Sequence, residues 1–157
     1  MIIALASHDD LAALVELENN FEASERWSQT SWRAELEGAD RLVLVCRDAD
    51  QVQAVACFWV VHQTAELLRV VVHPAARRRG LARKLIGLGK EWAEAAGAER
   101  ILLEVRHDNS AALALYEAAG FAPIAQRRDY YGPGRHGVVM ECQLPRHSLF
   151  QPAGWPA

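Results

Sequence analysis

Apolar and polar positions along the chain follow a helical spacing in some stretches and an extended pattern in others. Residues 1–6 form a short apolar run that predicts a strand. The apolar residues of 11–17 recur on one broad helix face, and Asp9 or Asp10 supplies an oxygen suited to cap that helix. A second helix is predicted over 28–38, because this stretch begins at a serine suited to an N-cap and ends at a glycine.

Three extended runs come next, and short polar segments separate them. The runs cover residues 41–47, 52–62 and 66–73 and are rich in valine and leucine. The separating segments, 48–50 and 63–64, have the composition of turns. The pattern therefore predicts an antiparallel meander of three strands.

A long helix is predicted after these strands and ends at Gly97. Its apolar residues are spaced by three and four positions, which places them in one stripe that we expect to face the sheet. The stripe consists of Leu81, Leu85, Leu88, Trp92 and Ala96.

The rest of the chain alternates between extended and helical patterns. Residues 101–105 predict a buried strand, and 111–119 predict a helix that Gly120 ends. Two further extended runs, 121–128 and 138–144, are joined by a Gly- and Pro-containing loop. We expect these two runs to form a hairpin.

Three segments have residues whose setting suggests a function. Glu104 interrupts an apolar strand, where a carboxylate buried without partners costs several kcal/mol, so it either faces a solvated side of the sheet or has a task. Tyr130 and Tyr131 lie side by side on the loop, where at least one of them faces a ligand or covers the edge of the core. Residues 21–27 are acidic and aromatic, a composition that fits ordinary packing or one wall of a substrate cleft.

The turn between the third strand of the meander and the long helix carries three consecutive arginines, Arg77 to Arg79, followed by Gly80. A helix N-terminus has unpaired N–H groups and partial positive charge, both of which favour an anion. The glycine allows a phosphate to approach the backbone, and guanidinium groups match phosphate oxygens. The turn therefore predicts a phosphate-bearing ligand, although an arginine cluster can also be a solvated surface.

Composition and charge restrict the class of protein. The chain has 157 residues, of which 51% are hydrophobic and 24% charged, and this is ordinary for a globular domain. A net charge of −3 gives no general attraction to nucleic acid or to anionic membranes. No segment has the pattern of a secretory signal or a membrane span. We expect one domain over residues 1–144, followed by a tail, 145–157, that is docked or frayed.

Cysteines and histidines argue against a metal centre. Cys46, Cys57 and Cys142 are widely spaced and each lies in an apolar run, so we expect buried free thiols rather than disulfides or zinc ligands. This usage fits a reducing, cytoplasmic setting. No histidine has zinc-ligand spacing to another histidine or to a cysteine, so we predict no metal site.

The chain resembles the GNAT superfamily of acetyl-CoA-dependent N-acetyltransferases over nearly its whole length up to Leu144. The family's phosphate-binding signature is matched by Arg77, Gly80 and Ala82. Within the superfamily the resemblance is to the RimI group, which acetylates the N-terminal alanine of a ribosomal protein. The segments that carry it are Trp27-Ser28, Trp32, Glu35-Leu36, Leu103-Glu104-Val105-Arg106, Asn109, Ala112, Leu115-Tyr116-Glu117, Gly120-Phe121 and Arg127-Arg128-Asp129-Tyr130-Tyr131.

This resemblance implies an α+β fold with a mixed, mostly antiparallel central sheet flanked by helices. It also implies that Glu104 is the general base, acting on the acceptor amine, and that Tyr116 is the general acid, protonating the leaving thiolate. Tyr130 and Tyr131 would contact the acceptor. Acetyl-CoA would be bound by the backbone of Val70, Val71 and Val72, by Arg77, Arg78, Arg79, Gly80, Leu81, Ala82 and Arg83, and by Asn109.

The acceptor implied by the resemblance is the terminal amine of a ribosomal protein. An α-amine has a pKa of about 7.7–8 and a lysine about 10.4, so presenting a lysine in its nucleophilic form costs roughly 3.5 kcal/mol more. This difference favours the terminal amine but does not exclude lysine. Two other functions stay open, namely acetylation of a small-molecule amine and non-catalytic binding of an acyl-CoA.

The sequence departs from the family pattern in two places. His73 stands where relatives commonly have aspartate, and His136-Gly137 stands where they often have acidic residues. The second departure leaves the acceptor's identity open. His73 and His107 follow strands near the proposed centre and are rival candidates for the base, with a structural role as the alternative for both.

Overall fold

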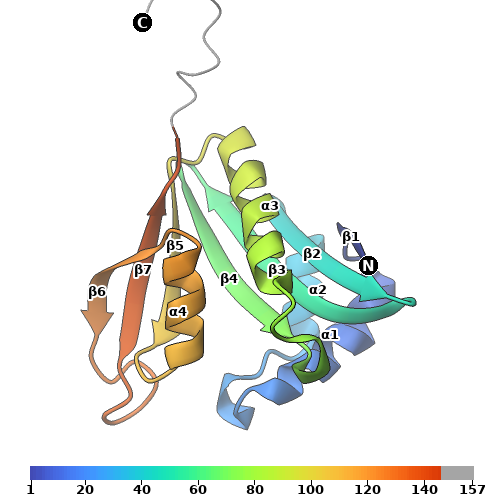
Figure 1. Ribbon diagram of the computed structural model, residues 1–157, viewed down its shortest axis with the longest axis horizontal. Coiled ribbons are helices and arrows are strands. Elements are labelled where there is room, and N and C mark those ends of the chain that lie inside the picture. Colours follow the sequence, from blue (N-terminus) through green and yellow to red (C-terminus); the bar gives the residue numbers. More distant parts are fainter. Residues whose placement is uncertain (146–157) are drawn as a thin grey trace, which may run out of the picture. The chain divides into compact units, whose positions relative to one another are not determined.

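The computed structural model describes residues 1–145, which contain seven strands and four α-helices. The strands form one sheet in the order β1-β2-β3-β4-β5-β7-β6 (Figure 1). The strands are β1 (Ile2–Leu5), β2 (Arg41–Asp48), β3 (Gln51–Val61), β4 (Thr64–Val72), β5 (Arg100–Arg106), β6 (Ala122–Arg127) and β7 (Gly137–Gln143). The helices are α1 (Leu11–Leu17), α2 (Gln29–Glu37), α3 (Leu81–Ala95) and α4 (Ser110–Ala118). This arrangement confirms the α+β fold that was expected.

The chain forms two compact units. The first consists of Met1–Trp59 with Leu67–Gly89, and the second consists of Val60–Glu66 with the segment from Lys90 onward. The predicted domain of 1–144 includes residues of both units and remains a prediction. The expected tail lies outside the described residues from position 146.

In the first unit, helices cover both faces of the strands. β1 pairs antiparallel with β2, and β2 pairs antiparallel with β3, while β4 is the next strand of the sheet as the meander predicted. α1 and α2 lie behind the strands in Figure 1, and α3 crosses in front of them. The core between the first two helices and the sheet consists of Leu11, Leu14, Leu17, Trp32, Val43, Val45, Val55, Cys57 and Val71.

The predicted ends of α2 are confirmed, but the cap of α1 is different from the one expected. The Ser28 hydroxyl accepts the Ser31 N–H (3.1 Å), and Gly38 is the C-cap. Asp10 precedes α1 without making a side-chain cap. Its carboxylate instead accepts the Ser7 N–H (2.8 Å), which closes the 3₁₀ turn at His8–Asp10.

The buried face of α3 is offset from the predicted stripe. Leu81 and Leu85 are buried as expected, but Leu88 is 39% exposed and Gly89 is buried in its place. A Cβ on Gly89 would lie 2.0 Å from Cζ of the fully buried Phe58. The glycine therefore lets the Phe58 ring reach the helix backbone, which an apolar pattern cannot register because glycine has no side chain.

One arginine of β4, Arg69, contacts the segment of residues 21–27. Arg69 pairs with Glu18, which is 1% exposed, and also donates to the Glu25 carbonyl (2.6 Å). The rings of Phe21 and Trp27 lie 3.9 and 5.0 Å from its guanidinium carbon. Both aromatic residues are partly buried against the core, so for these two side chains the packing interpretation is the one the structure shows.

In the second unit, β7 lies between β5 and β6. It pairs antiparallel with both, which confirms the predicted hairpin and adds that its second strand is the inner one. The first residues of β4, Thr64–Glu66, pair in parallel with Arg100–Leu102 of β5. α4 lies in front of β5 and β7 in Figure 1, and every residue of β6 is exposed. β6 is last in the strand order and is therefore an edge strand.

The three cysteines are free and buried, as the sequence predicted. Two of them, Cys46 and Cys57, lie on β2 and β3, and Cys142 lies on β7. Among residues 1–145, no helix combines the length and the apolar content needed to cross a bilayer.

Candidate active site

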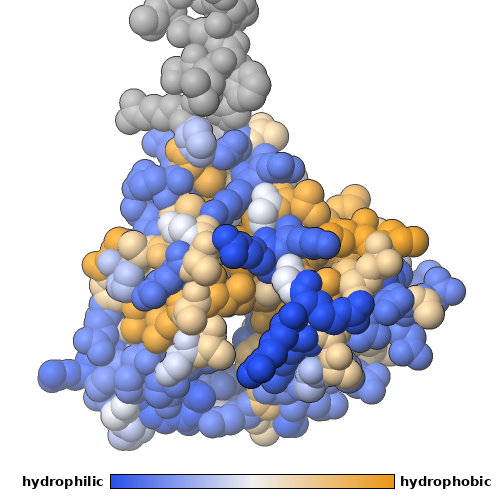
Figure 2. All heavy atoms as spheres, viewed as in Figure 1, coloured by the Kyte–Doolittle hydropathy of each residue, from blue (hydrophilic) through white to orange (hydrophobic). Residues whose placement is uncertain are grey.

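The turn between β4 and α3 is open. After the 3₁₀ turn at Pro74–Ala76, Arg78 and Gly80 both have positive φ angles, +63° and +75°. Residues 77–80 are all exposed, and a Cβ on Gly80 would meet no atom within 4 Å. Strongly hydrophilic atoms gather over this turn at the start of α3 (Figure 2). The geometry leaves room for an anion at the helix N-terminus, where first-turn N–H groups lack helical partners.

His73 organises the chain before this turn. Its Nδ1 accepts the Ala75 N–H (3.1 Å), and its own N–H donates to the Gln53 carbonyl (2.8 Å). An aspartate oxygen at this position would make the same cap, so the departure from the family pattern preserves the local geometry. The structure thus shows a structural role for His73, one of the two rival bases.

Glu104 on β5 has an arginine partner that the sequence did not reveal. Its side chain is 25% exposed, and its Oε1 lies 2.9 Å from Nε of Arg127. Arg127 ends β6, while Glu104 stands opposite Val139 of β7. The guanidinium therefore reaches the carboxylate across an intervening strand. The side chain thus faces a partly solvated side of the sheet, which is one of the two expected alternatives, and its carboxylate is paired with a charge.

Asn109 and Tyr116 belong to α4, the element that follows β5. Asn109 is the N-cap of this helix, and its Oδ1 accepts the Ala112 N–H (3.2 Å). Its side chain is exposed. Tyr116 is half-buried, and its ring meets that of Phe121 edge-on with centroids 6.0 Å apart.

The two loop tyrosines differ in exposure. Tyr130 is 53% exposed, whereas Tyr131 is half-buried, and their rings meet edge-on with centroids 5.0 Å apart. The Arg127 guanidinium carbon lies 5.2 Å from the Tyr130 ring. One arginine thus contacts both the proposed base and a tyrosine proposed to contact the acceptor.

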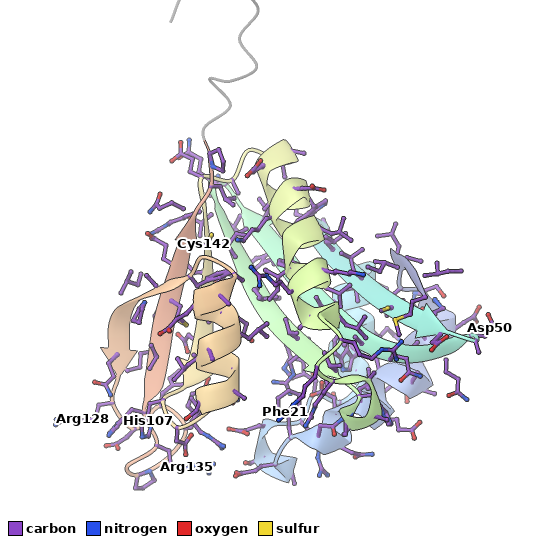
Figure 3. All side chains as sticks on the ribbon, in the orientation of Figure 1. Phe21, Asp50, His107, Arg128, Arg135 and Cys142 are labelled. Atoms are coloured by element: carbon purple, nitrogen blue, oxygen red, sulfur yellow. The ribbon has the colours of Figure 1, made fainter. Side chains whose placement is uncertain are left out.

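His107 and His136 form a pair next to this loop. Nδ1 of His107 accepts the His136 N–H (3.0 Å), and the His136 carbonyl accepts the His107 N–H (2.9 Å). Nδ1 of His136 accepts the Asp129 N–H (3.0 Å). Figure 3 labels His107 at the same end of the second unit as Arg128 and Arg135. These bonds tie the end of β5 to the loop, which is a structural role for the second rival base.

Within residues 1–145, no group of three or more potential ligand side chains could hold a metal ion. The site residues predicted from sequence divide between the two units. Arg77 to Arg83 and the valines of β4 belong to the first unit. Glu104, Asn109, Tyr116, Tyr130 and Tyr131 belong to the second.

Comparison with known protein families shows to which family the chain belongs. A sequence model described as the acetyltransferase (GNAT) family matches residues 9–121. The chain belongs to the GNAT acetyltransferase family. The resemblance inferred from the sequence is thereby confirmed, and the protein is an N-acetyltransferase.

Similar proteins cover most of this GNAT enzyme. It is 36% identical over 129 residues to the ribosomal protein bS18-alanine N-acetyltransferase of Salmonella typhimurium, spanning 82% of this chain and 86% of that protein. Identity to the enzyme of the same name from Escherichia coli (strain K12) is 34% over 122 residues, spanning 78% and 81%. A crystal structure of the Escherichia coli ribosomal-protein-S18-alanine N-acetyltransferase matches with a TM-score of 0.83 at 27% identity over 99% of both chains.

GNAT acetyltransferases use acetyl-CoA. An aminoglycoside 6′-N-acetyltransferase solved with coenzyme A has the same fold, with a TM-score of 0.81 at 15% identity over 93% of this chain and 99% of that one. Sequence reasoning missed one residue beside the proposed base, Arg127. In the sequence, Arg127 is a charged residue near the end of a predicted strand. Its place beside Glu104 can be recognised only when the strand order is known.

Proposed function

We propose that this GNAT enzyme transfers the acetyl group of acetyl-CoA to the N-terminal α-amine of a ribosomal protein that begins with alanine. The observation that supports this acceptor is the similarity to two bS18-alanine N-acetyltransferases over about four fifths of the chain. The acetyl thioester is the activated acyl group, and the residues of the chain bind it and move the protons.

The first unit supplies the proposed cofactor-binding residues. The backbone of Val70, Val71 and Val72 would pair with the pantetheine arm. Residues Arg78 to Arg83 would hold the pyrophosphate, because the exposed arginines match phosphate oxygens and the open space at Gly80 permits a close approach, and Arg77 would also bind the cofactor. Asn109 would add a contact through its exposed side chain.

The second unit supplies the proposed proton transfers. A carboxylate oxygen of Glu104 would accept a proton from the acceptor amine, directly or through water, since the side chain is partly solvated. The phenol of Tyr116 would donate its proton to the departing thiolate. Tyr130 and Tyr131 would contact the acceptor, and the exposed ring of Tyr130 is the more accessible of the two.

Two peptide pools test the acceptor. One pool has free N-terminal alanine and no lysine, and the other has a blocked N-terminus and free lysines. After incubation with the enzyme and acetyl-CoA, mass spectrometry locates each added acetyl group. We expect acetylation of the first pool at its α-amine. Acetylation only of the lysine pool, or only of small amines supplied in a third reaction, would replace this acceptor by a different one.

A further inference from the structure

We propose that Arg127 occupies the position beside Glu104 that the acceptor's ammonium group takes, so that the acceptor displaces Arg127 when it binds. This inference rests on the proposed function, in which Glu104 receives a proton from the acceptor amine. It adds a specificity-determining residue, because an acceptor must then compete with a cation that belongs to the enzyme.

The ion pair has the geometry of a substrate contact. Nε of Arg127 lies 2.9 Å from Oε1 of Glu104, a distance typical of a charge-assisted hydrogen bond. An α-ammonium is also a cationic N–H donor, and a carboxylate that removes its proton directly must lie within the same reach. Arg127 and the acceptor therefore present the same kind of group to the same carboxylate.

The pair is weak enough to be exchanged. The Arg127 side chain is 56% exposed and that of Glu104 is 25% exposed. Solvent-exposed ion pairs contribute about 0–1 kcal/mol, because water screens the charges and two long side chains must be held still. Water can also solvate the displaced guanidinium at once. Displacement thus costs the acceptor little and leaves no buried charge behind.

The structure also offers the displaced arginine a place to go. The Tyr130 ring lies 5.2 Å from the guanidinium carbon, within the range of a cation–π contact. Tyr130 is held by Tyr131 and by the backbone at Gly137, where an added Cβ would lie 3.4 Å from the Cβ of Tyr130. Arg127 can therefore leave the carboxylate while keeping its contact with the aromatic ring.

A second arginine lies at the same level of the sheet as Arg127. Arg106 and Arg127 both stand opposite Gly137 in the strand register, one on each side of β7. Arg106 pairs with Asp108 at 2.5 Å, and Arg127 pairs with Glu104 at 2.9 Å. Arg127, which pairs with the proposed base, belongs to β6, and every residue of β6 is exposed.

Kinetics of Arg127→Ala test the displacement, with Arg128→Ala as the matched control. Arg128 is the next residue, is exposed and lies beyond the outer end of β6 (Figure 3), so its removal takes away the same charge without touching Glu104. At about pH 8, with saturating acetyl-CoA and a peptide beginning with alanine, we expect Arg127→Ala to lower the peptide KM roughly two- to five-fold, the range that an exposed ion pair accounts for. The control should keep the wild-type KM.

A small cation provides the second readout. Methylguanidinium should inhibit Arg127→Ala competitively against the peptide, and more strongly than it inhibits the wild type, because it refills the vacated position. Unchanged or raised KM in Arg127→Ala, or a gain in kcat on adding methylguanidinium, would overturn the displacement and make Arg127 a residue that positions Glu104. Arg127→Gln serves as a second variant, and both are checked for wild-type thermal unfolding.

The same assay separates the two proposals. A wild-type enzyme that acetylates no primary amine would overturn the proposed function and the displacement together. A wild-type enzyme that is active, with KM unchanged by Arg127→Ala, would overturn only the displacement.

Discussion

At the scale of single residues, the interior of the protein sets the chemistry of its thiols. Cys57 is fully buried, and its Sγ lies 3.7 Å from a carboxylate oxygen of Glu35. Burial raises the pKa of the Cys57 thiol above its ordinary value, and the charge of Glu35 and the hydrogen bond to it raise the pKa further. A thiol with a raised pKa forms little thiolate, which is the nucleophilic species.

The three cysteines are accordingly expected to resist thiol reagents. In the native protein at about pH 8, Cys46, Cys57 and Cys142 should react with DTNB far more slowly than a free thiol, because all three are buried. In guanidinium chloride all three should react at once. Stoichiometric reaction of any of them in the folded protein within seconds would contradict this expectation.

The proposed base, Glu104, could be identified from the sequence, but its ion-pair partner, Arg127, could not. Glu104 stands out in the sequence because a carboxylate there interrupts an apolar strand. Arg127 comes near it through the strand order β5-β7-β6, in which β7, the last strand of residues 1–145, lies between the other two. That order depends on long-range pairing, which local patterns of polarity do not encode.

At the scale of elements, the turn before α3 contains two residues in the left-handed region of backbone conformation, Arg78 and Gly80. Only Gly80 has no side chain. A side chain at this φ angle costs about 1–2 kcal/mol even where space is available. Gly97, at the other end of the α3 region, has a φ of +90° and also has no atom within 4 Å of an added Cβ. The two glycines therefore share the backbone requirement, and only Gly80 lies in the arginine turn.

Substituting each glycine by alanine should separate folding from binding. Gly80→Ala and Gly97→Ala are both expected to lower the free energy of unfolding by about 1–2 kcal/mol. Only Gly80→Ala should also raise the Kd for acetyl-CoA, measured by calorimetry, because its methyl group and the altered turn hinder the approach of the phosphates. Equal affinity in the two variants would argue against the turn as the pyrophosphate site.

A second pair of glycines tests the packing of α3. Gly89→Ala places a methyl group against the ring of Phe58 and should destabilise the protein by about 1–3 kcal/mol in urea unfolding. Gly87 is exposed on the same helix with open space around it, so Gly87→Ala should stabilise by about 0.5–1 kcal/mol. If both changes stabilised the protein, the contact between Gly89 and Phe58 would be absent in solution.

These contacts explain why the limits of the strands and helices could be predicted, whereas the buried face of α3 could be predicted only in part. Strand and helix limits follow from local spacing, caps and turn residues, such as Ser28 and Gly38 at the ends of α2. The position of a glycine against an aromatic ring depends on the partner strand, so Leu88 was wrongly expected to face the sheet.

At the scale of the whole molecule, the fold and the enzyme family were predictable because the motifs extend over most of the chain. The family match covers residues 9–121, and the expected sheet flanked by helices is present. The net charge of −3 does not oppose binding of an anionic cofactor, because the exposed arginines of the turn concentrate positive charge locally. The fold does not identify the acceptor, since enzymes of one fold act on many different acceptors.

The central claim is that Glu104 is the base for acetyl transfer, and Glu104→Gln tests it most directly. The matched control is Glu141→Gln, which removes another partly buried strand carboxylate paired with an arginine, Arg100 (3.0 Å), in the same unit. With a peptide beginning with alanine near neutral pH, we predict that Glu104→Gln lowers kcat by about 10²–10⁴-fold while the Kd for acetyl-CoA stays unchanged. Glu141→Gln should keep the wild-type kcat. A Glu104→Gln enzyme that turns over at the wild-type rate would contradict the claim.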